Sequence, residues 1–282
     1  MLLATLTTPS GATTAAVQTD AGWLTLEDAH LSALLARSDW RAHVEAQRSA
    51  GGAVIAEVDA VYANPLPAPG KIICCGLNYA DHIAEAGRAT PEYPTLFAKY
   101  ADTLTGPGDD VRMPGSTKVD WEAELAVVVG TVLSRATVEE ARAGIAAYTV
   151  SNDISARDWQ ARTLQWFQGK AFDASTPLGP VLVTADAIDP KAGLDIRCAI
   201  NGEVVQDSNT RELVFDAADL VAYVSSFTTL RPGDIILSGT PGGTGLGLEP
   251  QRFLADGDIL TTTIEGIGEL RNTLRLDAPT TP

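Results

Sequence analysis

The sequence is poor in the residues and segments that mark secreted or membrane proteins. Only three of its 282 residues are cysteines, and Cys74 and Cys75 are adjacent. An odd number of cysteines without a Cys-x-x-Cys pair argues against a disulfide framework. No apolar run approaches the roughly 18 residues that a membrane-spanning helix needs, and the N-terminus lacks the basic and apolar regions of a secretory signal. We therefore expect a cytoplasmic protein with reduced, buried cysteines and no membrane partner.

Positive charge is also scarce. The chain has 20 basic and 36 acidic residues, which gives a formal net charge of −16. Such a surface repels phosphate backbones, so we do not expect nucleic acid as a partner. If the substrate is an anion, a local cation must overcome this field.

The first 66 residues have the pattern of a small unit of their own. Two short strand patterns flank a turn signal at residues 20–22. Helical periodicity follows, is broken near Ser38 and ends at Gly51 and Gly52. The next stretch, "YANPLPAPG", has the proline and glycine content of a connection. We predict a small N-terminal domain over residues 1–66 and a larger domain over residues 67–282.

Strand patterns dominate the larger domain. We predict strands in "KIICCGLNY", "ELAVVVGTVL" and "AYTVSND", and a hairpin that turns at Asn201 and Gly202. Helices are predicted for "VEEARAGIAAY", after a capping box that begins at Thr137, and for "FDAADLVAYVSSF", with Asp216 as its N-cap. Without regular alternation of strands and helices, the pattern favours a β-rich α+β fold over a Rossmann fold or a TIM barrel.

A pair of glutamates opens one of the most apolar strands, in "VDWEAELAVVVG". Glu122 and Glu124 are two residues apart, so they point to the same face of a strand. Adjacent carboxylates repel one another and are costly to bury unless a cation or a proton lies between them. With Asp153 of "TVSND" as a third member, they would form an all-oxygen site suited to Mg²⁺, Mn²⁺ or Ca²⁺. A solvated strand end would explain the same residues.

The stretch "NYADHIAEAG" predicts a short helix with Asn78 as a cap and Gly87 as its stop. His82 and Glu85 are then neighbours on one face of that helix. A carboxylate beside an imidazole orients it and raises its basicity, as a general base for water requires. An ordinary polar pair at a solvated helix end fits the same spacing.

Two further features contain candidate binding groups. Lys170 in "QGKAF" is flanked by glycine and apolar residues, which fits either a buried charge or a surface lysine with a buried stem. The glycine-rich loop over residues 237–247 does not end in Gly-Lys-Ser/Thr, so it is not a phosphate loop. Its backbone N–H groups and the Thr240 hydroxyl could still hold a carboxylate, although a plain flexible turn has the same composition.

Six segments, in order, make the sequence resemble the fumarylacetoacetate hydrolase family over residues 70 to 265. They are "GLNYADHIAEAG", "DWEAELAVVVG", "SNDISARDWQ", "GKAFDASTPLGP", "NGEVVQDSNT" and "PGDIILSGTPGG". The resemblance implies a mixed β-roll of the fumarylacetoacetase C-terminal domain type, preceded by a small N-terminal α/β domain and assembled as a homodimer.

The resemblance also implies roles for individual residues. Glu122, Glu124 and Asp153 match metal ligands for Mg²⁺ or Mn²⁺, with Ca²⁺ as a substitute. His82 matches the residue that activates water, with Glu85 as its partner, and Lys170 matches a lysine that faces the substrate. Arg157, Gln160 and Thr240 match positions that line the pocket or hold substrate. The stretch "KIICCG" lacks the further aspartate ligand of longer family members, so we expect three protein ligands.

Together with the resemblance, these residues predict a metal-dependent hydrolase of small anionic 2,4-dioxo acids. An acylpyruvate or fumarylpyruvate would be cleaved at a carbon–carbon bond to release pyruvate, in the catabolism of aromatic or related acids. Oxaloacetate decarboxylation, and isomerisation or hydration of a 2-hydroxydienedioate, remain alternatives because all these routes share an enolate. The histidine–glutamate pair favours hydrolysis, since decarboxylation needs no water nucleophile. A non-catalytic protein is disfavoured because all six segments are present.

Overall fold

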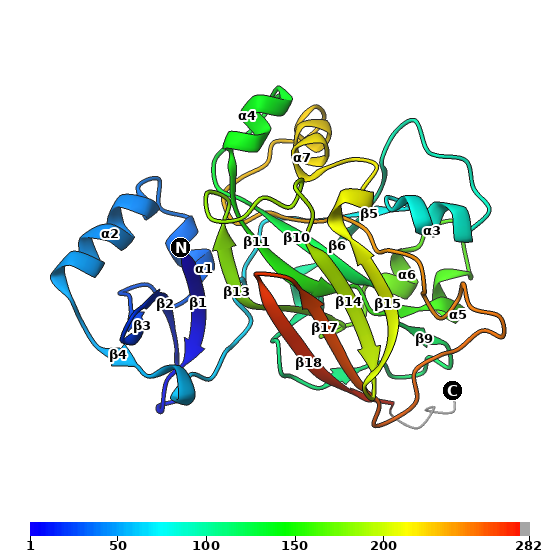
Figure 1. Ribbon diagram of the computed structural model, residues 1–282, viewed down its shortest axis with the longest axis horizontal. Helices are drawn as coiled ribbons and strands as arrows, with labels where there is room; N and C mark the ends of the chain where they lie inside the picture. Colours follow the sequence, from blue (N-terminus) through cyan, green and yellow to red (C-terminus); the bar gives the residue numbers. More distant parts are fainter. Residues whose placement is uncertain (277–282) are drawn as a thin grey trace.

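A sheet of eleven strands runs through the computed structural model, which describes residues 1–276 (Figure 1). Its strands follow the order β4-β3-β2-β1-β13-β11-β10-β16-β5-β6, and β7 pairs with β13 outside this path. The bounds are β1 Leu2–Thr7, β2 Thr13–Thr19, β3 Gly22–Thr25, β4 Val54–Ile55, β5 Ile72–Gly76, β6 Thr95–Lys99, β7 Leu104–Thr105, β10 Ala123–Val129, β11 Ile145–Asn152, β13 Thr176–Thr184 and β16 Ile235–Leu237.

A second sheet of five strands packs against the middle of the first. Its order is β15-β14-β17-β18-β8, and β14, β17 and β18 contact β10, β11 and β13 of the large sheet. The bounds are β8 Val111–Arg112, β14 Asp195–Ile200, β15 Glu203–Asn209, β17 Ile259–Ile264 and β18 Gly268–Arg275. A two-stranded sheet joins β9 Val119–Asp120 to β12 Ser155–Ala156.

Short helices complete the described chain. The α-helices are α1 Leu31–Leu35, α2 Trp40–Ala50, α3 Ala80–Glu85, α4 Val138–Ala143, α5 Arg157–Gln160, α6 Phe167–Lys170 and α7 Ala217–Ser225, and the 3₁₀ helices are η1 Glu57–Asp59, η2 Ala101–Thr103 and η3 Thr210–Glu212. The prediction of a β-rich α+β fold is confirmed.

Strand β10 is buried on both of its faces. Leu125 and Val127 belong to the core cluster that includes both sheets, whereas Ala126 and Val128 belong to a second cluster on the opposite face. A strand covered on both faces has an unbroken apolar sequence rather than an alternating one. This explains the run "LAVVV". Packing on both faces also holds β10, which begins next to Glu122, rigidly in place.

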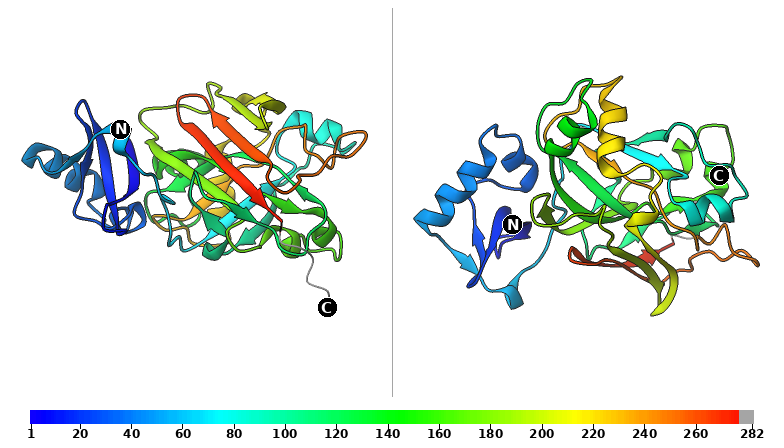
Figure 2. Two further views of the ribbon diagram at one scale, coloured as in Figure 1. Left: turned by 90° about the horizontal axis from the view of Figure 1, so that it is seen from below. Right: turned by 45° about the horizontal axis from the view of Figure 1, so that its top comes forward.

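The N-terminal unit extends the large sheet. Strand β1 pairs with β13 through Leu2 and Val183, and all views place β1–β4, α1 and α2 beside the main body (Figures 1 and 2). The second core cluster contains Trp40 of this unit together with Leu237 of β16. A domain boundary near residue 66 stays a prediction.

Several local predictions are confirmed. The capping box joins Thr137 to Glu140 at the start of α4, and Asp216 caps α7. The hairpin β14–β15 turns at Asn201 and Gly202, whose φ angles are 52° and 87°. Such left-handed conformations explain why the turn contains Asn-Gly.

Two local predictions are wrong. Helix α4 ends at Ala143, and Ile145 to Tyr148 belong to β11, because these apolar residues pair with β10 and extend its sheet. Asn78 does not cap α3, since Tyr79 is the N-cap residue. The Asn78 amide instead donates to the carbonyls of Phe215 and Ser238 and accepts from Phe215 N–H, at 2.8 to 3.0 Å.

Asn78→Ala should destabilise the fold substantially. The substitution leaves two carbonyls and one N–H without a partner at a fully buried position. Each such loss costs about 1–3 kcal/mol, so we expect a total decrease of at least about 3 kcal/mol in the free energy of unfolding. Urea denaturation followed by circular dichroism measures the change, and a decrease below 1 kcal/mol would contradict this account.

Candidate active site

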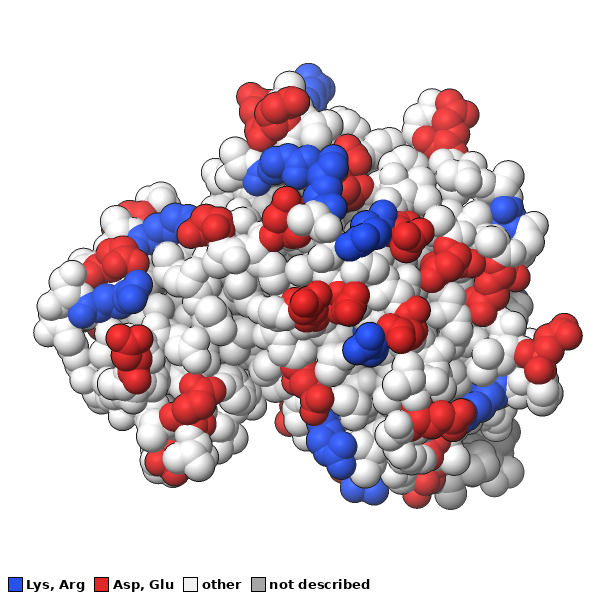
Figure 3. All heavy atoms as spheres, viewed as in Figure 1, with Lys and Arg blue, Asp and Glu red and all other residues white. Residues whose placement is uncertain are grey.

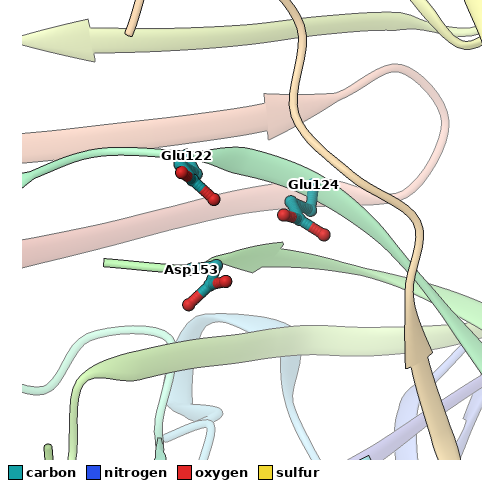
Figure 4. A group of neighbouring side chains, drawn as sticks. All are labelled: Glu122, Glu124 and Asp153. Carbon is teal, nitrogen blue, oxygen red and sulfur yellow. The ribbon is translucent and has the colours of Figure 1, made fainter. Parts of the chain in front are cut away.

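Three carboxylates meet where β10 begins and β11 ends. Glu122 and Glu124 come from the same chain segment, and Asp153 follows β11 directly (Figure 4). One oxygen atom from each lies within 4.8 Å of the others, and all three side chains are buried. The predicted face-sharing of Glu122 and Glu124 is therefore confirmed, as is their proximity to Asp153.

Three cations surround these carboxylates. Lys170 Nζ donates to Glu122 at 2.6 Å and to Asp153 at 3.0 Å, and Lys99 forms an ion pair with the other oxygen of Asp153. Arg157 joins Glu122 to Asp120, with both ion-pair distances at 2.7 Å. These buried side chains reduce the cost of placing so many carboxylates together.

The cations act unequally on the carboxylates. Burial alone would raise the pKa of Glu122, but Lys170 and Arg157 lower it to about 2. Burial raises the pKa of Glu124 well above its usual range, and the charges of Asp153 and Glu122 add to the effect. Among the described residues, no lysine or arginine forms an ion pair with Glu124. The cluster thus retains one carboxylate whose charge lacks a direct partner.

The glycine-rich loop after β16 binds carboxylates of the protein itself. Gly239 N–H donates to Glu124 at 2.8 Å, and Gly243 N–H donates to Glu85 at 3.0 Å. Asp120 accepts from Gly245 N–H at 2.7 Å and from Leu246 N–H at 3.0 Å. The carboxylates held by the loop are thus supplied by the chain itself, and binding of a substrate carboxylate there stays a prediction.

Gly239 is required for this arrangement. Its φ is 101°, and a Cβ atom there would lie 2.8 Å from the carbonyl oxygen of Cys75. A larger residue would therefore displace the N–H group that binds Glu124.

His82 and Glu85 contact each other as the helical spacing predicts. His82 Nδ1 lies 3.1 Å from Glu85 Oε2, and Gly243 N–H holds the other carboxylate oxygen. Because a carboxylate accepts hydrogen bonds, Nδ1–H donates to Glu85 and the lone pair lies on Nε2. The pair is thus arranged as an oriented base.

A cavity of about 640 Å³ brings the candidate residues together. Eight of the nine residues singled out in the sequence line this cavity: His82, Glu85, Glu122, Glu124, Arg157, Gln160, Lys170 and Thr240. The ninth, Asp153, is fully buried in the carboxylate cluster beside the cavity. Lys170 lines the cavity but donates its hydrogen bonds to Glu122 and Asp153.

Two polar groups in this cavity keep a free donor. Gln160 accepts from Arg157 through its amide oxygen at 3.0 Å, which leaves its NH₂ group available. Thr240 accepts from Gln206 at 2.8 Å, so its own hydroxyl proton is free to donate.

Three residues that support the site were not predicted from the sequence. Lys99 at the end of β6 neutralises Asp153, and Asp120 holds both Arg157 and the glycine-rich loop. Gln206 of β15 joins the Ala123 N–H to Thr240. The available signal for Lys99 was a charged residue at the end of the apolar pattern "TLFAK". The signal for Asp120 was a third acidic residue two positions before Glu122.

The residues fit a divalent cation. Three carboxylate oxygens form a hard ligand set of the kind that Mg²⁺ and Mn²⁺ prefer. Glu124, which lacks a cationic side-chain partner, is the residue whose charge such an ion would compensate most directly. The identity of the ion stays a prediction.

The fold and the cavity define an α+β protein with a buried carboxylate centre next to an oriented histidine. Residues 71–275 match the model of the fumarylacetoacetate hydrolase C-terminal domain. The chain therefore belongs to the fumarylacetoacetate hydrolase family and is an enzyme of that family.

Relatives with different named activities share this sequence and fold. The chain is 47% identical over 210 residues to the rat mitochondrial oxaloacetate tautomerase Fahd2a, covering 74% of this chain and 67% of the rat protein. A 5-carboxymethyl-2-hydroxymuconate delta-isomerase from Mycobacterium smegmatis has a TM-score of 0.79 and 32% identity, over 98% of this chain and all of that one. A fumarylacetoacetate hydrolase from Exiguobacterium antarcticum has a TM-score of 0.83 and 30% identity, with the same coverage.

No helix within residues 1–276 is long and apolar enough to cross a membrane. The rat relative is named as mitochondrial, and a cytoplasmic location for this chain stays a prediction.

Glu124→Gln should weaken divalent metal binding by at least tenfold, because it removes a ligand charge from the carboxylate cluster. Calorimetric titration of the EDTA-treated protein with Mn²⁺ measures the dissociation constant. Glu85→Gln is the matched control, since Glu85 lines the same cavity but lies outside the cluster. Equal affinity in wild type and Glu124→Gln would exclude the cluster as the metal site.

Proposed function

We propose that this enzyme transfers a proton at the carbon next to the oxo group of a 2-oxo acid, interconverting keto and enol forms. The observation that carries the proposal is the shared cavity: the oriented His82 faces the same space as the Glu122–Glu124–Asp153 cluster. A divalent cation bound by that cluster would supply Lewis acidity toward the carboxylate and oxo group of the substrate.

The protein side chains would divide the remaining work. His82 Nε2 takes the proton from carbon 3, while Glu85 holds the ring and stabilises its positive charge. Return of that proton to the enolate oxygen gives the enol without any change in composition. The free donors of Gln160 and Thr240 would hold the substrate carboxylate, and Lys170 and Arg157 keep the centre from becoming too negative to accept it.

The comparisons favour proton transfer over the hydrolysis predicted from the sequence. The rat relative at 47% identity is named an oxaloacetate tautomerase, and the structural neighbour from Mycobacterium smegmatis is named an isomerase. Neither name implies a water nucleophile, and one base next to an acidified carbon is sufficient for both reactions.

Hydrolysis of acylpyruvates is the second candidate. It is supported by the fold shared with the fumarylacetoacetate hydrolase from Exiguobacterium antarcticum and by a cavity large enough for substrate and water. In that reaction His82 would take its proton from water instead of from carbon. Decarboxylation needs no base, so the His82–Glu85 pair gives it no support.

His82→Ala should lower kcat for oxaloacetate tautomerisation about 100- to 10,000-fold, the usual contribution of a general base. Glu85→Gln should lower it less, because the imidazole remains. The rate is followed by the ultraviolet absorbance of the enol, with EDTA-treated protein before and after addition of Mg²⁺ or Mn²⁺.

The same variants separate the candidates. Release of pyruvate from acetylpyruvate tests hydrolysis, and release of carbon dioxide from oxaloacetate tests decarboxylation. Wild-type hydrolysis without tautomerisation would replace the proposal by the second candidate. Full tautomerase activity in His82→Ala would contradict the assigned role of His82.

A further inference from the structure

Arg88 is the one arginine or lysine of the described cavity lining that no side chain neutralises. Arg157 and Lys170, the other cations of that lining, bind Asp120, Glu122 and Asp153. Within residues 1–276, the Arg88 guanidinium forms no hydrogen bond, ion pair or ring contact, and its side chain is exposed. In a chain of net charge −16, an arginine left unpaired at a cavity is available for an anionic ligand.

The backbone at Arg88 is fixed although its side chain is free. Arg88 N–H donates to the Ile83 carbonyl at 3.1 Å, and Gly87 N–H donates to the Ala84 carbonyl at 3.0 Å. Gly87 has a φ of 61°, which completes a Schellman motif at the end of α3. The backbone of Arg88 is thus anchored to the helix that carries His82, and both residues line the same cavity.

The charges of the carboxylate centre allow one substrate carboxylate there. When all groups are ionised, four acidic side chains (Asp120, Glu122, Glu124 and Asp153) meet three basic ones (Lys99, Arg157 and Lys170), which leaves one negative charge. A divalent cation would change this to one positive charge, and a single carboxylate would neutralise it. A second carboxylate at the same end would lack any compensating charge.

Positive charge is scarce on the surface of the chain as a whole. One face of the molecule carries many more acidic than basic side chains (Figure 3), in keeping with the overall excess of 36 acidic over 20 basic residues. The rest of the outer lining is mainly apolar, as at Leu164, Trp166 and Leu246.

We propose that Arg88 binds a second, distal carboxylate of the substrate, so that the enzyme selects 2-oxo dicarboxylic acids over 2-oxo monocarboxylic acids. The proposal rests on the proposed function for the first carboxylate and the oxo group. Arg88 supplies a forked guanidinium that matches a carboxylate, and it acts in substrate selection rather than in proton transfer.

The test compares binding of diacids and monoacids of equal chain length. The probes are 2-oxoglutarate and 2-oxoadipate against 2-oxopentanoate and 2-oxohexanoate, titrated calorimetrically into Mn²⁺-loaded protein. Arg88→Gln should weaken diacid binding by about 10- to 100-fold, the range for a hydrogen-bonded charge pair. Monoacid binding should change less than twofold, and Arg88→Lys should recover part of the diacid affinity.

Arg162→Gln is the matched control. Arg162 lies between two residues of the cavity lining, Ala161 and Thr163, but stacks on Trp159 at 3.6 Å from the ring centre and does not itself line the cavity. This substitution removes the same charge from the same region. It should leave the ratio of diacid to monoacid affinity unchanged.

The outcomes separate this inference from the proposed function. An Arg88→Gln protein that keeps the wild-type diacid preference overturns the inference, whatever the activity. Equal loss of diacid preference in Arg88→Gln and Arg162→Gln also overturns it, since general electrostatics would then be the cause. If Arg88→Gln alone loses the diacid preference and the wild-type protein has no tautomerase activity, the inference is supported and only the proposed function is contradicted.

Discussion

The structure depends on keeping four carboxylates buried in one small volume. Asp120, Glu122, Glu124 and Asp153 are each less than one-tenth exposed, and their mutual repulsion must be offset for the chain to fold. The offset comes from distant parts of the sequence: the ammonium groups of Lys99 and Lys170, the Arg157 guanidinium, and backbone N–H groups of the glycine-rich loop. Strand β10, packed on both faces, is the rigid element around which these parts assemble.

The backbone N–H groups of the glycine-rich loop bind carboxylate side chains of the protein itself. These groups bind Glu124, Glu85 and Asp120, which belong respectively to the carboxylate centre, the base and the support of Arg157. One loop therefore couples the position of the proposed base to the position of the proposed metal ligands. Glycine is needed at position 245, because a Cβ atom on Gly245 would collide with the Arg252 carbonyl oxygen and would lie 2.8 Å from Asp120 Oδ1.

The parts of the site that local rules govern were predictable from the sequence. The two-residue period of a strand places Glu122 beside Glu124, and the helical period places His82 beside Glu85. Lys99 and Asp120 were missed because their partners are set by tertiary structure: Lys99 meets Asp153 across 54 positions, and Asp120 meets Gly245 across 125. The same limit explains Asn78, whose side chain was expected to cap its own helix but joins the segment between η3 and α7 to the loop after β16. The order of six segments, rather than any one residue pattern, identified the family.

The arrangement also explains how one centre can serve several reactions in this family. Tautomerisation and acylpyruvate hydrolysis both need an acidified oxo group and one oriented base, and they differ in whether that base takes its proton from carbon or from water. The carboxylate centre and the His82–Glu85 pair would have the same arrangement in both reactions, because their side chains are positioned by contacts with each other and with the loop. Discrimination must then arise from groups farther out in the cavity, which position the rest of the substrate and admit or exclude water. Arg88, Leu164 and Trp166 belong to that part of the lining, and within residues 1–276 no hydrogen bond or ion pair joins them to the buried carboxylates, so they are suited to act on the substrate without belonging to the centre.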